Sequence, residues 1–411
     1  RSPSRGLGDV YKRQVLTYYR TGNFGANLQA VSTYNYLKKK GHEVIFLHYL
    51  SHRTNYVETK LEKVNQQLKE HYRFIDKNLP LQSCKILTIN KLRRVIAENQ
   101  IDAILIGSDA VLQHFPIFST LQWGQGLKAW FQPLQGERRF PNIFWGYGFA
   151  NDIPTAMISV SSQNSPYNKW NVITKKRMAK CLINLRYISV RDEWTQKLVH
   201  TVCPSLMPPI TPDPVFAFNQ NAGHLIPPKE EICKKFGLQE EYALIGLRGN
   251  YLSDTKIKEI EREFAVRGIQ SVAFPVLTPS KLPYKKKINL PLNPIDWYAL
   301  IKYASAYIGN NMHPIVVSLH NAVPCFSIDN WGTTNFWGKN IDNGSSKVQD
   351  ILNRYGLIKN RSIITNGQCH VTTDEIFKAL DDFDKKKITE ISNRQFEQYN
   401  DMMNKSLKSL L

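Results

Sequence analysis

Short apolar runs alternate with charged, amphipathic segments along most of the 411-residue chain. Apolar runs of about four to eight residues that are bounded by turn residues predict buried strands, and the longer segments between them predict helices. Strands that are apolar on both faces are typical of parallel sheets covered by helices on both sides. The predicted fold class is therefore α/β, with doubly wound parallel sheets. The runs that predict strands are VLTYY (15–19), EVIFLHY (43–49), DAILIG (102–107), AMISV (156–160), RYISV (186–190), YALIGL (242–247), IQSVAFPV (269–276), AYIG (306–309) and VPCFSID (323–329).

A proline-rich stretch divides this alternation into two halves. The segment 203–231 holds seven prolines in 29 residues, and proline at this density continues neither a helix nor a central strand. Strand and helix patterns restart after it. We therefore predict an N-terminal Rossmann-like domain, 15–218, that ends in a proline-rich linker. A C-terminal Rossmann-like domain, 219–411, follows and ends in a charged helix, and the two domains are expected to face each other across a cleft.

The first fourteen residues, RSPSRGLGDVYKRQ, do not fit the pattern of the rest. They resemble a translated adapter or an assembly scar, and their four basic residues against one acidic residue add +3 to the net charge. We therefore interpret 1–14 as foreign to the fold and expect the first strand to begin only at Val15.

Composition and charge narrow the class of protein. A hydrophobic content of 42% indicates a folded globular chain, and no apolar run approaches the roughly 18 residues of a membrane-spanning helix. Six scattered cysteines without a C-x-x-C pair fit neither a disulfide framework nor a zinc site, so we expect a cytoplasmic protein and predict no metal. The net charge of +20 favours anionic ligands. No RGG repeat, recognition-helix signature or RNP-like run supports nucleic acid as the partner.

The last thirty residues are charged and predict a helix. We expect this helix to pack back on the body of the protein. The alternative is peripheral contact with the inner face of the membrane, as basic amphipathic helices make.

Polar side chains follow six of the predicted strands. Ligands of open parallel sheets bind beyond the carboxyl ends of the strands, so residues at these positions are the first candidates for a site. Both halves contribute such residues, which favours one shared cleft. They are Thr21, Asn23, Gly25 and Asn27; Ser108 and Asp109; Ser161, Ser162 and Gln163; Arg191, Asp192 and Glu193; Arg248, Gly249 and Asn250; and Asn310, Asn311 and His313.

The segment YIGNNMHPIVVSLH (307–320) places a histidine where a strand ends and a helix begins. Pro314 fits the first helical position because its missing N–H needs no partner there, so His313 is expected at or beside the N-cap. A helix N-terminus attracts anions and lowers the pKa of an imidazole, whereas a bound phosphate or carboxylate raises that pKa again. His313 is therefore a candidate general acid that gains its proton when an anionic substrate binds. The alternative is a histidine that only caps the helix.

Arg191 follows a buried strand, where a guanidinium can clamp a carboxylate or phosphate through two hydrogen bonds. The alternative is an ion pair with a neighbouring acid. The segment TGNFGANLQA (21–30) has glycines at a strand–helix turn but lacks both G-x-G-x-x-G and the Walker lysine, so it predicts a close approach rather than a nucleotide site. We interpret Asp213 as a turn or hinge residue. Lys347 follows two serines that suit a helix N-cap, and no firm role is assigned to it.

Several of these segments occur together in one known family. The segments GNFGANLQAVSTYNYLKKKGHEVIFLHY, DAILIGSDAVLQ, SVRDEWTQKLV, DPVF and AYIGNNMHPIVVSLHNAVPCFSID, in this order, resemble the polysaccharide pyruvyl transferase family from about Val15 to about Ile351. The resemblance implies a fold like that of the two-domain type B glycosyltransferases. It also implies transfer of pyruvate from phosphoenolpyruvate, as a cyclic ketal, to a sugar of an exopolysaccharide or cell-surface glycan precursor, with release of phosphate.

The resemblance also implies roles for particular residues. Arg191 and His313 correspond to family positions that are implicated in phosphoenolpyruvate binding and catalysis. The family has an arginine two residues before this histidine, where the present chain has Asn311. An asparagine cannot neutralise a carboxylate, so Arg248 is our candidate for the missing charge. The C-terminal half would bind the donor and the N-terminal half the acceptor, a sugar or lipid-linked oligosaccharide, with no cofactor beyond phosphoenolpyruvate as co-substrate. The expected substrate-binding residues are Arg248, Asn310, Asn311, Asn23, Gly25, Asn27, Ser108 and Asp109.

Two alternatives stay open at this point. A nucleotide-sugar-dependent glycosyltransferase of the same architecture would bind a nucleoside diphosphate in the second half. A non-catalytic glycan-binding homologue would bind sugar without releasing phosphate, and Asn311 is the main argument for it.

Overall fold

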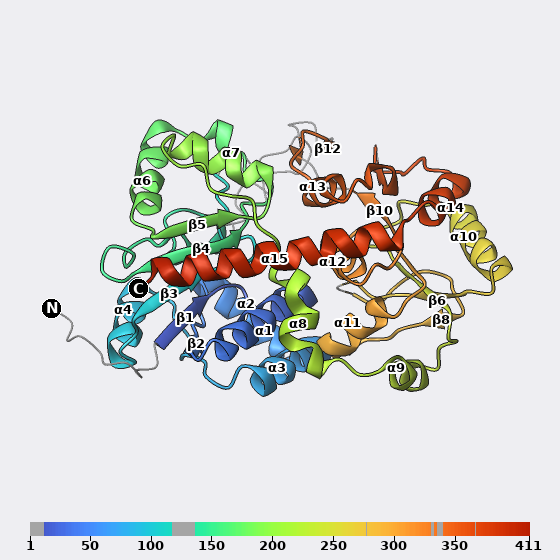
Figure 1. Cartoon of the computed structure of the whole chain (residues 1–411), viewed down its shortest axis with the longest axis horizontal. Coiled ribbons are helices and arrows are strands. Elements are labelled where there is room, and N and C mark those ends of the chain that lie inside the picture. Colours follow the sequence, from blue (N-terminus) through green and yellow to red (C-terminus); the bar gives the residue numbers. More distant parts are fainter. Residues whose placement is uncertain (1–11, 117–135, 277, 330–332, 335–339, 366) are drawn as a thin grey trace.

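A computed structural model of the chain describes residues 12–116, 136–276, 278–329, 333–334, 340–365 and 367–411. The chain forms two halves, each built around a parallel sheet with helices on its faces (Figure 1). The prediction of an α/β fold with parallel sheets is therefore confirmed.

The first half holds a five-stranded sheet in the order β2-β1-β3-β4-β5. All of its strand pairs are parallel. The strand order reverses between β1 and β3, and ligands of such sheets bind at the reversal. Its elements are β1 (Lys12–Leu16), α1 (Phe24–Lys39), β2 (Glu43–Phe46), α2 (His52–Val64), α3 (Gln66–Asn78), α4 (Ile89–Glu98), β3 (Ala103–Ile106), β4 (Thr155–Val160), α6 (Val172–Ile183), β5 (Tyr187–Val190) and α7 (Glu193–Val202).

The second half holds a six-stranded sheet in the order β13-β10-β9-β6-β7-β8. Numbered within this half, the order is that of the Rossmann fold, and it reverses between β6 and β9. Its elements are α9 (Lys229–Phe236), β6 (Tyr242–Gly246), α10 (Asp254–Val266), β7 (Gln270–Ala273), β8 (Lys286–Lys287), α11 (Pro294–Lys302), β9 (Ala306–Gly309), α12 (Met312–His320), β10 (Cys325–Asp329), α13 (Lys347–Arg354), β13 (Arg361–Ile363) and α14 (Thr373–Asp381).

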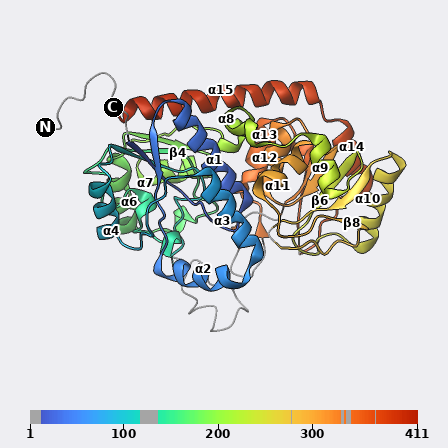
Figure 2. The ribbon, with the colours of Figure 1, turned by 90° about the horizontal axis from the view of Figure 1, so that it is seen from below.

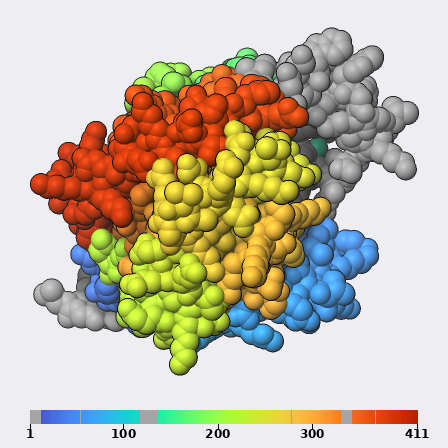
Figure 3. All heavy atoms as spheres, turned by 90° about the vertical axis from the view of Figure 1, so that its right-hand side faces the viewer, coloured from blue at the N-terminus to red at the C-terminus, as the bar shows by residue number. Residues whose placement is uncertain are grey.

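The proline-rich linker and the C-terminal helix join the halves. The linker forms the 3-10 helix η5 (Pro214–Ala217) and the short helix α8 (Phe218–Ala222), and both contact α1. The last helix, α15 (Lys385–Ser409), runs along both halves and contacts β4 and β5 of the first sheet as well as α12 of the second half (Figure 2). Viewed from its outer end, the second half covers most of the face, and residues of the first half appear around its margins (Figure 3).

One hydrophobic core extends across the boundary between the halves. It includes residues of α1, such as Phe24 and Leu28, together with Trp297 of α11 and Ile315 of α12. The rings of Phe24 and Trp297 stack with their centroids 5.1 Å apart and an interplanar angle of 5°. Because the boundary is packed like a domain interior, the two sheets hold a fixed relative position.

The first strand begins earlier than expected. β1 starts at Lys12 rather than Val15 and pairs with β2 and β3 along its length. Residues 12–14, which the sequence pattern led us to exclude, therefore belong to the sheet, because main-chain pairing does not depend on side-chain type. The origin of the segment 1–14 stays a prediction, and 1–11 lie outside the described residues.

The C-terminal helix packs on the body, as predicted. Its buried residues include Ile388, Tyr399, Met402 and Met403, so its apolar face is covered by protein. Within the described ranges, none of the helices combines the length and the apolar character needed to cross a bilayer. Peripheral contact with a membrane stays a prediction.

The shared core predicts the effect of Trp297→Ala. Removing this ring opens a cavity between the halves, so the free energy of unfolding should fall by about 3–5 kcal/mol in urea titrations. A single transition should persist, because one core serves both halves. Val266→Ala, at a position that is 80% exposed in α10, is the matched control and should change stability by less than about 0.5 kcal/mol. Separate unfolding of the two halves in the wild type would contradict the prediction.

Candidate active site

A cavity of about 440 Å³ lies where the carboxyl ends of the two sheets meet. Both halves line it, so the predicted cleft is present. Residues that follow β1, β3, β4 and β5 line it from the first half, and residues that follow β6 and β9 line it from the second. Among them are Thr17, Tyr18, Asn23, Asp109, Gln163, Arg191, Arg248, Asn311, His313 and Lys347.

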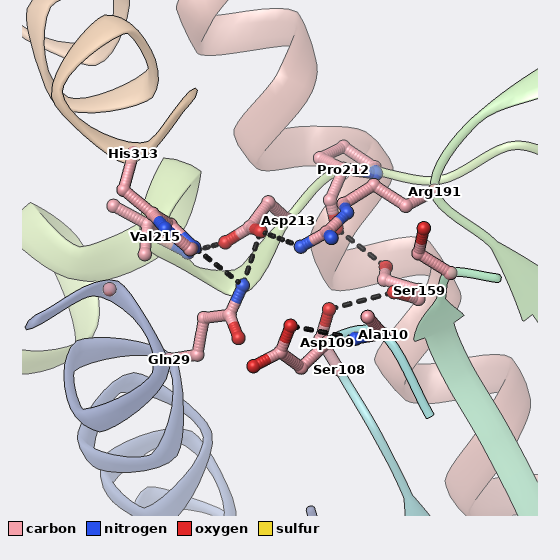
Figure 4. Close-up of polar contacts among 12 residues, drawn as sticks. Gln29, Ser108, Asp109, Ala110, Ser159, Arg191, Pro212, Asp213, Val215 and His313 are labelled. Atoms are coloured by element: carbon pink, nitrogen blue, oxygen red, sulfur yellow. Dashed lines mark hydrogen bonds and ion pairs between the residues drawn. The ribbon is translucent and has the colours of Figure 1, made fainter. Parts of the chain in front are cut away.

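Arg191 is a buried cation at one wall of this cavity. Its Nη1 donates to Asp213 Oδ2 at 2.6 Å, and the two side chains are only 3% and 1% exposed (Figure 4). Burial disfavours the charge, but Asp213, with help from Asp109 and Asp192, raises the pKa of Arg191 on balance. Its Nε and Nη2 have no hydrogen-bond partner among the described residues. The guanidinium therefore keeps two donors for a bound anion.

Asp213 is the centre of a small polar network. Its Oδ1 accepts a hydrogen bond from the Val215 N–H at 2.9 Å and so caps η5. Gln29 of α1 donates its amide N–H to the other carboxylate oxygen (Figure 4). The linker, β5 and α1 thus meet at one carboxylate.

His313 faces this network from the second half. Gln29 Nε2 lies 3.3 Å from His313 Nε2 (Figure 4). An amide nitrogen only donates, so this hydrogen bond requires an unprotonated Nε2 and assigns a neutral imidazole to the unliganded protein. Burial lowers the pKa of His313, and Arg191 and Lys347 lower it further, while Asp213 and Asp109 act in the opposite direction. Extra negative charge in the cavity would raise this pKa.

Gly25 packs directly against the His313 ring. A Cβ built on Gly25 would lie 2.1 Å from His313 Cγ, which is far inside van der Waals contact. The glycine in the first strand–helix turn therefore makes room for the imidazole of the other half. The predicted close approach at this turn is confirmed, with a side chain of the same protein as the approaching group.

Asp109 occupies a backbone conformation that most residues avoid. Its φ is +99°, and its carbonyl accepts hydrogen bonds from the N–H groups of Val111 and Ser161 at 2.9 Å each. Its Oδ1 accepts a bond from the Ala110 N–H at 2.7 Å. Such a strained residue persists because its surroundings fix it, and this one holds a carboxylate at the cavity wall.

Lys347 supplies a second cation close to Arg191. It is the first residue of α13, and Ser346 caps the helix by accepting from the Gln349 N–H, as the sequence predicted. Burial, with repulsion from Arg191, lowers the pKa of Lys347 to about 8. Arg354 of the same helix donates to the Arg191 carbonyl oxygen at 2.7 Å and so ties α13 to the end of β5.

Arg248 lines the cavity and is exposed. Lys347 lines it too and acts to lower the pKa of His313, and Arg191 in turn acts to lower the pKa of Lys347. The role of Arg248 as the cation that replaces the charge missing at Asn311 stays a prediction, and Lys347 is a second candidate for it.

Four of the predicted substrate-binding residues do not line the cavity: Gly25, which packs against His313, and three that hydrogen-bond to the backbone, Asn27, Ser108 and Asn310. Asn27 donates from Nδ2 to the Thr21 carbonyl at 2.9 Å, and Ser108 donates to the Ser159 carbonyl at 2.7 Å. Asn310 exchanges two hydrogen bonds with the backbone of Arg248 and so joins the ends of β9 and β6. Their polar side chains stabilise the strand ends, because buried backbone groups there need partners.

The helix that carries His313 begins earlier than predicted. α12 starts at Met312 with Asn311 as its N-cap, so Pro314 is the third helical residue and His313 the second. Proline is tolerated anywhere in the first turn, because none of the first N–H groups has an intrahelical acceptor. His313 still lies at the mouth of the cavity.

Sequence reasoning missed two members of the network. Gln29 falls on a helix interior, where the pattern gives no reason to single out a polar residue. Asp213 was read as a turn residue, which is correct for its cap, but its pairing with Arg191 depends on contact across 22 positions. The only sequence signal was an acid beside two prolines in an otherwise apolar linker.

The sequence model of the polysaccharide pyruvyl transferase family matches residues 23–332, most of the chain. The chain belongs to the polysaccharide pyruvyl transferase family. The predicted family is thus confirmed, and with it a transferase whose acceptor is a sugar or glycan. The match includes Arg191 and His313 and ends before Lys347. A search of curated proteins found no match.

The solved structures that are similar to this chain are distant in sequence. UDP-N-acetylglucosamine 2-epimerase from Rickettsia bellii has a TM-score of 0.54 at 10% identity, over 98% of this chain and 97% of that one. UDP-GlcNAc 2-epimerase from Methanocaldococcus jannaschii gives 0.48 at 11%, over 94% and 99%. ADP-heptose lipopolysaccharide heptosyltransferase II from E. coli gives 0.36 at 12%, over 95% and 99%. At such identities the likeness concerns the fold alone, and the prediction of two Rossmann-like domains is confirmed.

Metal binding has no obvious site in the part of the chain that is described. No group of three or more His, Cys, Asp or Glu residues there is arranged to hold an ion. The metal-free reaction stays a prediction.

The contact between Gly25 and His313 predicts the effect of Gly25→Ala. The added methyl group should displace the imidazole from Gln29 and lower the free energy of unfolding by about 1–3 kcal/mol. The ring resonances of His313 in NMR spectra should shift. Gly22→Ala is the matched control in the same turn, because a Cβ there meets nothing within 4 Å. Unchanged His313 resonances in Gly25→Ala would contradict the assignment.

Proposed function

We propose that the protein transfers pyruvate from phosphoenolpyruvate to a sugar of an exopolysaccharide or cell-surface glycan precursor, as a cyclic ketal, with release of phosphate. The observation that carries the proposal is a buried guanidinium with two unpaired donors, at Arg191, in one cavity with His313 and Lys347. The reaction would take place in the cytoplasm on a sugar or lipid-linked oligosaccharide, with phosphoenolpyruvate as the only co-substrate.

The donor needs a site that balances several negative charges. Phosphoenolpyruvate carries a carboxylate and a phosphate, and buried anions bind where charged donors are already in place. Arg191 offers Nε and Nη2, and Lys347 adds a flexible ammonium group. The first turn of α12 adds backbone N–H groups and the positive end of the helix dipole. Lys347 thereby provides the charge that Asn311 cannot.

His313 is the candidate general acid. Bound phosphoenolpyruvate would raise the pKa of His313 against the lowering effect of burial. The imidazolium then donates its proton to the methylene carbon, which becomes a methyl group. The C2 carbon becomes an oxocarbenium-like centre.

Two sugar hydroxyls complete the ketal. The first attacks C2 and loses its proton, and Asp109 is the carboxylate placed at the cavity wall to accept it. The C2–O bond to phosphate then breaks, the second hydroxyl attacks C2, and its proton leaves with the inorganic phosphate. The fixed conformation of Asp109 suits this role, since a positioned base needs no reorganisation during the reaction.

Phosphate release tests the proposal. Purified protein is incubated with phosphoenolpyruvate and candidate glycan acceptors, and the product is checked for a ketal by mass spectrometry and NMR. His313→Ala should lower turnover by about 10²–10⁴-fold, the usual contribution of a general acid. His370→Ala, at an exposed histidine, is the control and should retain turnover. Full turnover by His313→Ala would rule out the general-acid assignment.

Ligand binding by the purified protein distinguishes this function from the two alternatives, a nucleotide-sugar glycosyltransferase and a non-catalytic homologue. A nucleotide-sugar glycosyltransferase would be stabilised against heat by UDP or GDP and not by phosphoenolpyruvate. A non-catalytic homologue would bind sugar without phosphate release, and Asn311→Arg would then gain activity.

The lowered pKa of Lys347 predicts how donor affinity depends on pH. This lysine is charged below about pH 8 and loses its proton above, so the KM for phosphoenolpyruvate should rise as pH increases through about 8. Lys347→Arg keeps its charge over this range and should flatten the rise, while kcat changes less. A KM for the wild type that stays constant from pH 7 to 9 would contradict a role for Lys347 in donor binding.

A further inference from the structure

The far end of the cavity has a different chemistry from the donor end. Its lining comes from the first half only and is acidic and aromatic rather than basic. The residues are Tyr18, His48, Tyr49, Thr54, Glu58, Gln113, Glu137 and Arg138.

Two tyrosines form an aromatic wall there. The rings of Tyr18 and Tyr49 pack on Phe144, with centroid distances of 4.6 Å and 5.1 Å. Tyr18 also links the two ends of the cavity. Burial raises its pKa, and the carboxylates of Glu137 and Asp109 both add to the effect. A ligand against this wall is therefore adjacent to Asp109.

Glu58 of α2 places a carboxylate in this end without a strong partner. Among the described residues its hydrogen-bond donor is Tyr72 Oη at the long distance of 3.5 Å, and it takes part in no salt bridge there. Burial raises its pKa to about 7 against the opposing charge of Lys85, and Glu137 contributes to the rise. A desolvated carboxylate needs hydrogen-bond donors, and the protein supplies few.

Glu137 adds a fixed second carboxylate. It is buried and accepts hydrogen bonds from the Ser51 N–H and, at 3.0 Å, from the Thr54 hydroxyl, both in the first turn of α2. Among the described residues, three cations act on this end: Arg138 and Lys85 are exposed, so solvent screens their charge, and Arg20 is paired with Asp76. The carboxylates of Glu58 and Glu137 therefore make the electrostatic potential at this end of the cavity negative.

Two further polar groups at this end are buried and unused. Gln113 is 4% exposed and His48 is 8% exposed, and both line the cavity. Gln113 Oε1 and His48 Nε2 have no hydrogen-bond partner among the described residues. Buried polar atoms are normally paired, so these point to a ligand with hydroxyl groups.

We propose that this end of the cavity is the acceptor subsite and that it selects neutral sugar rings. Glu58, Gln113 and His48 would accept hydrogen bonds from sugar hydroxyls while Tyr18 and Tyr49 cover the apolar face of the ring. A ring that carries a carboxylate or phosphate would meet Glu58 and Glu137 at short range and be repelled. The inference rests on the proposed function only in calling the bound sugar the acceptor.

Direct binding at pH 8, above the pKa of Glu58, tests the proposal. NMR titrations use methyl glycosides of glucose, galactose and mannose, each paired with the corresponding methyl uronate. The wild type should bind at least one neutral glycoside about tenfold or more tightly than its uronate. Glu58→Gln should lower the affinity for the neutral glycoside about tenfold, because a charged hydrogen-bond acceptor becomes a neutral one. It should also reduce the preference for the neutral glycoside over its uronate. Glu62→Gln, one turn later in α2 and outside the cavity lining, is the matched control and should bind as the wild type does.

Three results would overturn the proposal: uronates that bind as tightly as their neutral partners, a Glu58→Gln variant with unchanged affinity, or no neutral glycoside that binds. Melting temperatures of both variants confirm that they fold. The test is separate from that of the proposed function, since phosphoenolpyruvate is absent. Selective sugar binding without phosphate release in any assay would support the acceptor subsite and contradict the transferase reaction. Phosphate release without selective sugar binding would support the transferase reaction and contradict the subsite.

Discussion

The ion pair between Arg191 and Asp213 holds the candidate site together. The carboxylate of Asp213 pairs with Arg191, accepts from Gln29 and caps η5, so β5, α1 and the linker converge on it. A buried pair of this kind contributes little net stability, because desolvation offsets the Coulomb attraction. The ion pair instead fixes the position of the guanidinium. One nitrogen of the guanidinium is anchored, and the two that remain have no hydrogen-bond partner among the described residues.

The shared hydrophobic core gives this arrangement its rigidity. In many two-domain enzymes a small polar interface allows the halves to rock, but here Phe24 and Trp297 stack within one core that spans both sheets. α15 adds a second connection along both halves. His313 therefore reaches Gly25 and Gln29 of the other half in the unliganded structure. Preorganised groups lose little freedom when they stabilise a transition state, which is the main advantage of such a site.

The charges along the cavity fit the two unlike substrates of the proposed reaction. Arg191 and Lys347 stand at the end that suits a small anion, and Glu58 and Glu137 stand at the end that suits hydroxyl groups. Asp109 and His313 line the same cavity, and the Asp109 carboxylate acts to raise the pKa of His313.

The sequence by itself determined the class of fold, the order of its elements and the family, because hydrophobic period and strand-end motifs are local properties of the chain. It also placed Arg191, His313, Asp109 and Asn23 at the cavity, since strand ends of a parallel sheet converge on one edge. It did not separate them from Asn27, Ser108 and Asn310, which have the same polar character but pair with nearby backbone. Only the tertiary structure decided that Gln29, Asp213 and Lys347 complete the site. Their roles arise from contacts between segments far apart in the chain: the fold of the first half and the linker brings Gln29 and Asp213 to Arg191, and the packing of the two halves adds Lys347.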